Sequence, residues 1–307
     1  MDNVGAEQIR FRCAISAINR EDNIRVFSQD TSGGIREATC EKGRWNGGTD
    51  DDVIAYGILG TPIAALQKKT DEMTHVFFIG EGNVVREMCR DENRESWREG
   101  EINKMNIRVA PYSMMCACFV EGHNQQGMRL YVQMMDNSIQ EFGCDDSRLG
   151  WLQMSKIGRA LPGTGLACAC TPGRDMCIRL FCQNEDMDIV EHCSRDGHTF
   201  KTGTLHIKKA NPRTDLTAIM CGDTETQVYY VDRENRVREM CTTNDKWQQG
   251  DFDQPCVPGS QVAAVSWGPR RECHICVYFQ GGYQVTAITE WKYHGRWEEG
   301  QRGLPPA

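Results

Sequence analysis

Three features are missing from this 307-residue sequence: a long apolar run, an excess of positive charge and a helical hydrophobic period. No apolar run approaches the ~20 residues that a membrane-spanning helix needs, so we expect no membrane insertion. The formal net charge is −8, which argues against a phosphate-binding surface and against nucleic acid as a partner. Because no segment repeats its apolar residues at helical spacing, we expect an all-β chain.

The N-terminus, MDNVGAEQ, lacks the charged and then apolar pattern of a signal peptide. We therefore expect a cytoplasmic protein, or one that reaches the spore or cell surface by unconventional export. The chain has 16 cysteines, and many alternate within apolar segments, where a free thiol packs as a small hydrophobic group. We expect mostly reduced, buried thiols. Cys273 and Cys276 form the only C-x-x-C, without a second ligand pair, so no zinc site is expected there.

A short β-hairpin is the unit that repeats along the chain. Residues 24–29 (IRVFSQ) alternate as a strand does, residues 30–34 (DTSGG) suit a turn, and residues 35–40 (IREATC) alternate again. The first anchor is Arg25, and the pattern recurs at His75, Arg129, Arg179, Gln227 and Cys276. Successive anchors are 50, 54, 50, 48 and 49 residues apart, and each is followed by a Glu 12 residues on, or 14 in the sixth copy.

A repeat of ~45–50 residues has the size of one four-stranded propeller blade. Each copy begins with an apolar run rich in Ala and Cys, which suits the crowded innermost strand, and most copies end with an aromatic residue followed by a Gly. We predict that residues 1–307 form one six-bladed β-propeller with four antiparallel strands in each blade. The last copy ends soon after Trp297, so residues 7–12 are predicted to supply its outer strand and close the ring.

Arg25 and Glu37 are the residues of the hairpin that point to a function. Folding the hairpin about position 31 places them opposite one another on one face of the sheet. The same arithmetic pairs Arg129 with Glu141. A cross-strand ion pair is the simpler interpretation. However, the Glu is present in all six copies and the Arg in only three. Since a guanidinium and a carboxylate suit vicinal hydroxyls, we favour a ligand site.

The repeat resembles that of the fungal fucose-specific lectins of the Aleuria type. The similarity spans essentially the whole chain and includes APYS (110–113), LPGTG (161–165) and the terminal LPPA (304–307). The resemblance implies a six-bladed propeller, commonly a homodimer, that binds fucose between adjacent blades without catalysis, cofactor or metal. It implies that Arg and Glu of one blade hydrogen-bond the sugar and that the closing aromatic residue of the next blade stacks on it.

Carried over to this sequence, the resemblance gives six candidate sites. The complete sets are Arg25, Glu37 and Trp97 for the first site, and Arg179, Glu191 and Trp247 for the fourth; the third has Arg129 and Glu141 with Phe200. The others depart from the family pattern: His75, Glu87 and Trp151 for the second, Gln227, Glu239 and Trp297 for the fifth, Cys276, Glu290 and Trp45 for the sixth. We expect strong binding at the first and fourth sites, intermediate binding at the third and little at the rest.

Two other functions fit a propeller. A propeller glycosidase, such as a sialidase, would need a paired acid and nucleophile in one site, whereas the carboxylates here are distributed one per copy. Residues 194–200 (SRDGHTF) only partly match an Asp box. A protein-interaction propeller would keep the repeat without placing Arg, Glu and Trp together. The favoured partners are fucosylated glycans and glycoproteins, bound at several sites at once.

Overall fold

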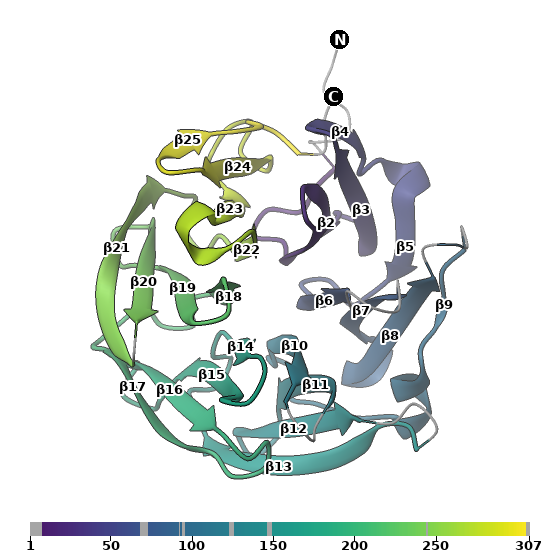
Figure 1. The fold of residues 1–307 in the computed structure, drawn as a ribbon. Coiled ribbons are helices and arrows are strands. Elements are labelled where there is room, and N and C mark those ends of the chain that lie inside the picture. Colours follow the sequence, from purple (N-terminus) through teal and green to yellow (C-terminus); the bar gives the residue numbers. More distant parts are fainter. Residues whose placement is uncertain are drawn as a thin grey trace.

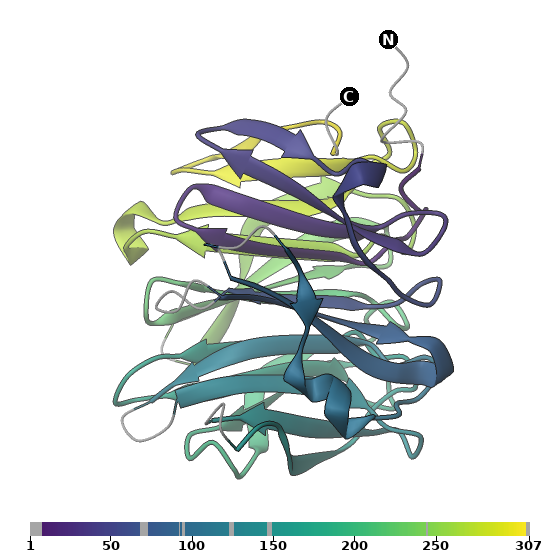
Figure 2. The same cartoon turned by 90° about the vertical axis from the view of Figure 1, so that its right-hand side faces the viewer.

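The computed structural model describes residues 8–67, 73–91, 93, 96–122, 126–145, 149–243 and 245–304. These residues form a ring of six antiparallel sheets around a central axis (Figure 1). The first blade contacts both the sixth and the second, and in the side view its purple strands lie above the blue strands of the second blade (Figure 2). Within the described ranges, no helix has the length and apolar character to cross a membrane. The predicted fold class is confirmed.

Each blade has four strands in the order in which they follow along the chain. The first three blades contain β1 (Ile15–Arg20), β2 (Asn23–Gln29), β3 (Gly34–Glu41) and β4 (Arg44–Gly47); β6 (Ile63–Gln67), β7 (Met73–Gly80), β8 (Val84–Asp91) and β9 (Arg98–Glu99); β10 (Met115–Glu121), β11 (Gln126–Gln133), β12 (Ser138–Cys144) and β13 (Leu152–Arg159). In the first blade an additional strand, β5 (Val53–Tyr56), also pairs with β3.

The last three blades repeat this arrangement. They contain β14 (Ala167–Thr171), β15 (Cys177–Gln183), β16 (Ile189–Ser194) and β17 (Lys201–Ile207); β18 (Leu216–Cys221), β19 (Glu225–Val231), β20 (Arg236–Thr243) and β21 (Lys246–Pro255); β22 (Val262–Trp267), β23 (His274–Gln280), β24 (Ile288–Tyr293) and β25 (Trp297–Glu299). Four short 3-10 turns, η1 (Asp50–Asp52), η2 (Glu81–Asn83), η3 (Glu101–Met105) and η4 (Arg270–Glu272), lie between strands.

The predicted hairpin turn at residues 30–34 is present. Asp30 Oδ1 accepts hydrogen bonds from the backbone N–H groups of Ser32 at 2.9 Å and Gly34 at 2.7 Å, an Asx-type turn that an Asp can make with its own backbone. Gly33 has φ +95°, a conformation that favours glycine. The side chain of Asp30 therefore fixes the loop between β2 and β3.

Buried glutamines at the ends of the second strands tie neighbouring blades together. Gln29, Gln133, Gln183 and Gln280 are fully buried. The Gln29 amide donates to the carbonyl of Ile58 at 2.9 Å and accepts from the N–H of Gly60 at 2.7 Å, both in the linker to the second blade. Gln133 and Gln183 make the same pair of bonds to the linkers that follow the third and fourth blades. Each satisfied amide therefore holds an inter-blade crossing in place.

The N-terminal segment closes the ring in a different way from the one predicted. The outer strand of the sixth blade is β25, which pairs with β24, so residues 7–12 do not supply it. Residue 7 lies outside the described residues. Ile9 instead forms a bridge with Asp30 in the first blade, while Gln280 accepts from the N–H of Arg12 at 2.7 Å and donates to the carbonyl of Arg10 at 3.1 Å. Residues 8–12 therefore occupy the position of a sixth inter-blade linker.

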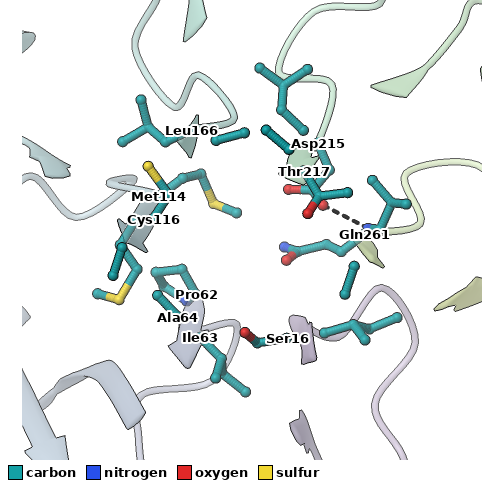
Figure 3. A pocket seen from close by; sticks show the side chains of 18 of the residues that line it. Ser16, Pro62, Ile63, Ala64, Met114, Cys116, Leu166, Asp215, Thr217 and Gln261 are labelled. Atoms are coloured by element: carbon teal, nitrogen blue, oxygen red, sulfur yellow. Dashed lines mark hydrogen bonds between the residues drawn. The ribbon is translucent and has the colours of Figure 1, made fainter. Parts of the chain in front are cut away.

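The inner strands surround a cavity of about 120 Å³ on the propeller axis (Figure 3). Among the residues that line it are Ser16, Ala64, Cys116, Leu166, Thr217 and Gln261. Small side chains are needed where six strands converge. The one carboxylate in the lining, Asp215, accepts the backbone N–H of Val262 at 2.7 Å. Burial raises the pKa of Asp215 to about 7, because the ionised form is poorly solvated there.

Most cysteines behave as predicted. Fourteen are free thiols, and ten of these are buried. Cys221 and Cys273 are joined by a disulfide, which the sequence did not predict. Cys273 therefore pairs with the preceding blade and not with Cys276, so the C-x-x-C sequence is not used as a unit.

Candidate functional site

The hairpin register differs by two residues from the predicted one. Phe27, and not Arg25, pairs directly with Glu37, and Arg25 pairs with Thr39. Blades three and four show the same shift, with Tyr131 opposite Glu141 and Phe181 opposite Glu191. The prediction that Arg and Glu stand opposite one another is wrong. An even shift keeps them on one face as diagonal neighbours, and Arg25 Nε lies 3.5 Å from Glu37 Oε1.

Each predicted aromatic residue lies across the blade interface from the anchor strand of the preceding blade. Trp97 meets Phe27 edge to face with ring centroids 6.1 Å apart, and Trp247 meets Phe181 at 5.7 Å. The same edge-to-face geometry joins Phe77 to Trp151, Tyr131 to Phe200, Tyr229 to Trp297 and Tyr278 to Trp45. The structure therefore brings together the residues of all six candidate sites, which we call sites one to six after the blade that carries the Glu.

The recurring Glu also has a role within its own blade. In blades two to six its Oε2 accepts a backbone N–H of the outer strand or the turn beside it, from Ile102, Ser155, Leu205, Phe252 or Gln301, at 3.0–3.3 Å. This contact explains the Glu in blades that lack the Arg. From the sequence, the Glu in all six copies was interpreted as a sign of a ligand site, and this contact was not predicted.

The same contact explains the glycine three residues after the closing aromatic residue. A Cβ on Gly100, Gly203, Gly250 or Gly300 would lie only 2.1–2.4 Å from Oε2 of the Glu of that blade. No side chain fits at such a distance. The Gly three residues after the aromatic residue therefore leaves room for the carboxylate of the Glu, which lies against the outer strand.

Site four has an arginine and a carboxylate beside an open cavity. Arg179 Nη1 donates to Glu191 Oε1, and Trp247 Nε1 donates to Glu191 Oε2 at 3.3 Å. Arg179 also lines a cavity of about 560 Å³ with Cys193, Gly203 and Asp245 among its other walls. Arg179 Nε is buried and has no hydrogen-bond partner within the described part of the chain. One donor of the guanidinium is therefore unused within the described residues.

The charges of site four keep its carboxylates ionised. Burial opposes ionisation of Glu191, but the backbone N–H of Leu205 and the charge of Arg179 outweigh it, so the pKa of Glu191 lies below its usual value. Asp245, from the fifth blade, also accepts from Arg179, and this contact lowers the pKa of Asp245. Sequence reasoning missed Asp245, whose only signal is its place two residues before Trp247.

Site one contains a second arginine that the sequence did not reveal. Arg90, on β8 of the second blade, donates to both oxygens of Glu37, at 2.7 Å from Nη1 and 2.5 Å from Nη2. Its guanidinium carbon also lies 4.5 Å from the ring centroid of Trp97, a cation–π contact. Arg90 thus covers both the carboxylate and the indole that the prediction assigns to the ligand.

Site three is closed. The side chains of Arg129 and Glu141 have no exposed surface, and Arg129 Nη1 is paired with Asp145 at 2.5 Å. The Tyr131 hydroxyl donates to Glu141 Oε1 at 2.8 Å, and burial raises the pKa of Glu141. A ligand could reach Arg129 only after Asp145 had moved.

The residue directly opposite each Glu divides the six sites into two groups. It is Phe27, Phe77 or Phe181 in sites one, two and four. It is Tyr131, Tyr229 or Tyr278 in sites three, five and six, where the hydroxyl occupies Oε1 of the Glu at 2.8–3.0 Å. Only sites one and four combine the Arg with a Phe. This difference is visible in the sequence, but its meaning depends on the true register.

The remaining sites replace the Arg in three ways. In site two His75 Nδ1 lies 2.7 Å from Glu87 Oε1. In site five Gln227 Oε1 lies 3.0 Å from the Tyr229 hydroxyl, which it shares with Glu239. In site six Cys276 is buried, and Lys292 on the paired strand lies 3.0 Å from Glu290. None of these offers the two-pronged charged donor of an arginine.

Repeated clusters of polar and aromatic side chains at the interfaces of a closed six-bladed ring are typical of a propeller of the carbohydrate-binding class. The chain belongs to the fungal fucose-specific lectin family, whose sequence profile matches residues 9–307. Proteins of this family bind fucose and are not catalysts.

Individual relatives agree with this assignment. A fucose-specific lectin of Aspergillus oryzae is 35% identical over the whole of both chains. The solved structure of SapL1 lectin in complex with alpha methyl fucoside is 35% identical, with a TM-score of 0.88 over 99% of this chain and 100% of that one. The Aleuria aurantia lectin structure, at 24% identity, a TM-score of 0.84 and coverage of 98% and 99%, shows the same six-bladed fold.

Proposed function

We propose that this chain is a multivalent lectin that binds L-fucose on glycans and glycoproteins at the interfaces between blades, foremost at site four. The observation that carries the proposal is the position of Arg179, which lines an open cavity beside Glu191 and Trp247 and whose Nε has no partner among the described residues. A buried donor without a partner costs ~1–3 kcal/mol, and a sugar hydroxyl would satisfy it. The guanidinium and the carboxylate suit neighbouring hydroxyls, and the indole suits an apolar sugar face.

Site one carries the same three kinds of residue, but Arg90 lies across them. A sugar that stacks on Trp97 and hydrogen-bonds to Glu37 must first displace the guanidinium of Arg90. We therefore place site one second to site four in affinity. Site three follows, because Arg129 has no exposed surface and Tyr131 already donates to Glu141.

A glycosidase is less well supported by the charges in site four. A glycosidase needs one carboxylic acid kept protonated by a raised pKa beside a second, ionised carboxylate. Glu191 and Asp245 both contact Arg179, and the pKa of each is lowered. The pair therefore supplies two acceptors and no acid.

The proposal is tested by replacing Arg179 with Lys and titrating α-methyl fucoside by calorimetry. R179K keeps the positive charge but loses the fork, so binding at site four should weaken about 10- to 100-fold, from ~1.5–3 kcal/mol for hydrogen bonds to a charged group. Arg159, a largely exposed arginine that pairs with Glu185 and does not line this cavity, gives the matched control R159K, which should bind as the wild type does. Unchanged binding by R179K would remove the site from the proposal.

Several weak sites at fixed spacing gain avidity on a surface that displays many fucose residues. Replacing Arg25 and Arg179 together by Ala should therefore abolish most agglutination of fucosylated cells. Assembly as a homodimer and unconventional export stay predictions of the resemblance and of the N-terminal sequence.

A further inference from the structure

Site two combines three side chains that bind metal ions. His75 on β7 pairs directly across the strands with Cys89 on β8, and Glu87 lies two residues before Cys89, on the same face of the sheet. Cys89 Sγ is 3.3 Å and Glu87 Oε1 is 2.7 Å from the same nitrogen, Nδ1 of His75. In the described ranges this is the one group of three or more His, Cys, Asp or Glu ligand atoms that lie within 4.8 Å of each other.

The donor set has the chemistry of a zinc site. Imidazole nitrogen, thiolate sulfur and carboxylate oxygen bind Zn²⁺ at about 2.0–2.3 Å, with three protein ligands and a water in open sites. Ligands at those bond lengths in a tetrahedron stand about 3.3–3.7 Å apart. His75 and Glu87 therefore need to separate by less than about 1 Å, while Cys89 is already at the right distance from the imidazole.

Neighbouring groups fix the orientation of Glu87, as outer contacts do for the ligands of metal sites. Its Oε2 accepts the backbone N–H of Ile102 at 3.2 Å, which leaves Oε1 facing His75. Its backbone is clamped by the Asn103 amide, which accepts from the Glu87 N–H at 2.7 Å and donates to the Glu87 carbonyl at 3.2 Å. The His75 ring lies parallel to Phe77, with an interplanar angle of 8°. Outer contacts of this kind orient metal ligands.

The site is buried but reachable. The side chain of Glu87 is 2% exposed, whereas that of His75 is 12% exposed. Of these two ligands, the His75 side chain is therefore the one that a cation and its fourth ligand, a water, would meet first. Because the residue opposite Glu87 is Phe77, no tyrosine hydroxyl occupies Oε1, unlike the arrangement in blades three, five and six.

Comparison between the blades shows that the combination belongs to the second blade alone. The fifth blade has the same Glu and Cys, Glu239 and Cys241, but Gln227 stands in place of the histidine and Tyr229 donates to Glu239. The fourth blade has Glu191 and Cys193, but its anchor is Arg179, which would repel a cation. The fifth blade therefore serves as a natural control.

We propose that site two is a site for a thiophilic divalent cation of the Zn²⁺ type, bound by His75 Nδ1, Glu87 Oε1 and Cys89 Sγ with a water as the fourth ligand. The Cys89 thiol gives up its proton to solvent as the metal–sulfur bond forms. Glu87 is then a metal ligand and not a sugar ligand, so the metal replaces the sugar at this interface. The proposal does not depend on fucose binding at the other sites.

The test is Zn²⁺ alone, titrated into chelator-treated full-length protein in competition with a chromophoric chelator. The wild type should bind one more tight Zn²⁺ per chain than H75Q, which keeps all sixteen cysteines and carries the residue natural to the fifth blade. Binding at the site should weaken by at least about 100-fold, because losing even a supporting partner costs 10- to 100-fold.

Co²⁺ gives a spectroscopic test whose first result requires only the wild type. The wild type should show a thiolate-to-cobalt charge-transfer band, which H75Q and C89S should lose, while Q227H/Y229F should add a second equivalent in the fifth blade. Equal metal uptake by the wild type and H75Q, or no thiolate band in the wild type, would overturn the proposal. The lectin proposal would survive either result, because titration of α-methyl fucoside at site four is measured separately.

Discussion

The aromatic residue opposite the Glu gives a sharp test of how the sites differ. Phe181 stands directly across from Glu191 in site four, where tyrosines in three other blades donate to the equivalent carboxylate. F181Y therefore brings a hydroxyl within reach of Glu191 Oε1. The other oxygen already accepts from Thr204, Leu205 and Trp247, so Oε1 is the acceptor left for a sugar.

The expected loss of affinity in F181Y follows from the number of hydrogen bonds that Glu191 Oε1 can still accept. Oε1 of Glu191 has room for about two hydrogen bonds, and Arg179 uses one. A tyrosine hydroxyl would fill the other, and a sugar must displace it. A hydrogen bond to a charged group contributes ~1.5–3 kcal/mol, so F181Y should weaken fucoside binding at site four about 10- to 100-fold.

The assay is calorimetric titration of α-methyl fucoside into wild type, F181Y and F77Y. F77Y makes the same change in site two, which we do not expect to bind the sugar, so it should leave the isotherm unchanged. The reverse change, Y131F, should free Glu141 and improve site three. The reasoning is refuted if F181Y, shown by its melt to be folded, binds with wild-type affinity and stoichiometry.

Three further predictions concern Arg90, which covers site one, the closure of the ring by the N-terminal segment, and the buried Asp215. Arg90→Ala uncovers Glu37 and Trp97, so binding at site one should strengthen; weaker binding would mean that Arg90 itself contacts the sugar. Deleting residues 1–12 removes buried Ile9 and the two hydrogen bonds of Gln280 to Arg10 and Arg12. This is a loss of roughly 3–6 kcal/mol that should lower the melting temperature by many degrees; an unchanged melt would show that the segment does not close the ring. Asp215 has a raised pKa of about 7, so the folded state loses stability as pH rises from about 4 to about 7. D215N should melt above wild type at pH 8 and close to it at pH 4. An equal difference in melting temperature at both pH values would exclude Asp215 as the cause.

The repeat made the fold and the pairing of blades predictable. Six copies with fixed spacing between the anchor and the Glu determined the number of blades, and the closing aromatic residues fell at the predicted interfaces. Parity alone decides which face of a strand a residue occupies, so Arg25 and Glu37 were correctly placed together although the register was wrong by two. The error came from the turn, whose centre depends on how Asp30 binds its own backbone.

Contacts between side chains of neighbouring blades could not be predicted from the sequence. Arg90 and Asp245 come from the blade next to the Glu that they affect, and their reach depends on how two twisted sheets pack. The end of the chain was misassigned for a related reason. The last strand is short, and hydrogen bonds from the Leu304 region to Ile288 extend the outer edge of the sixth blade, so no strand was missing there.

The most direct test of the central claim is the number of α-methyl fucoside molecules that one chain binds, measured by calorimetry at a concentration that resolves each site. With site four complete, site one gated by Arg90 and site three closed, the account predicts more than one and fewer than six, with the tightest site lost in R179K. Six equivalent sites would show that the Arg and the opposing Phe do not matter. No binding at all would contradict the function.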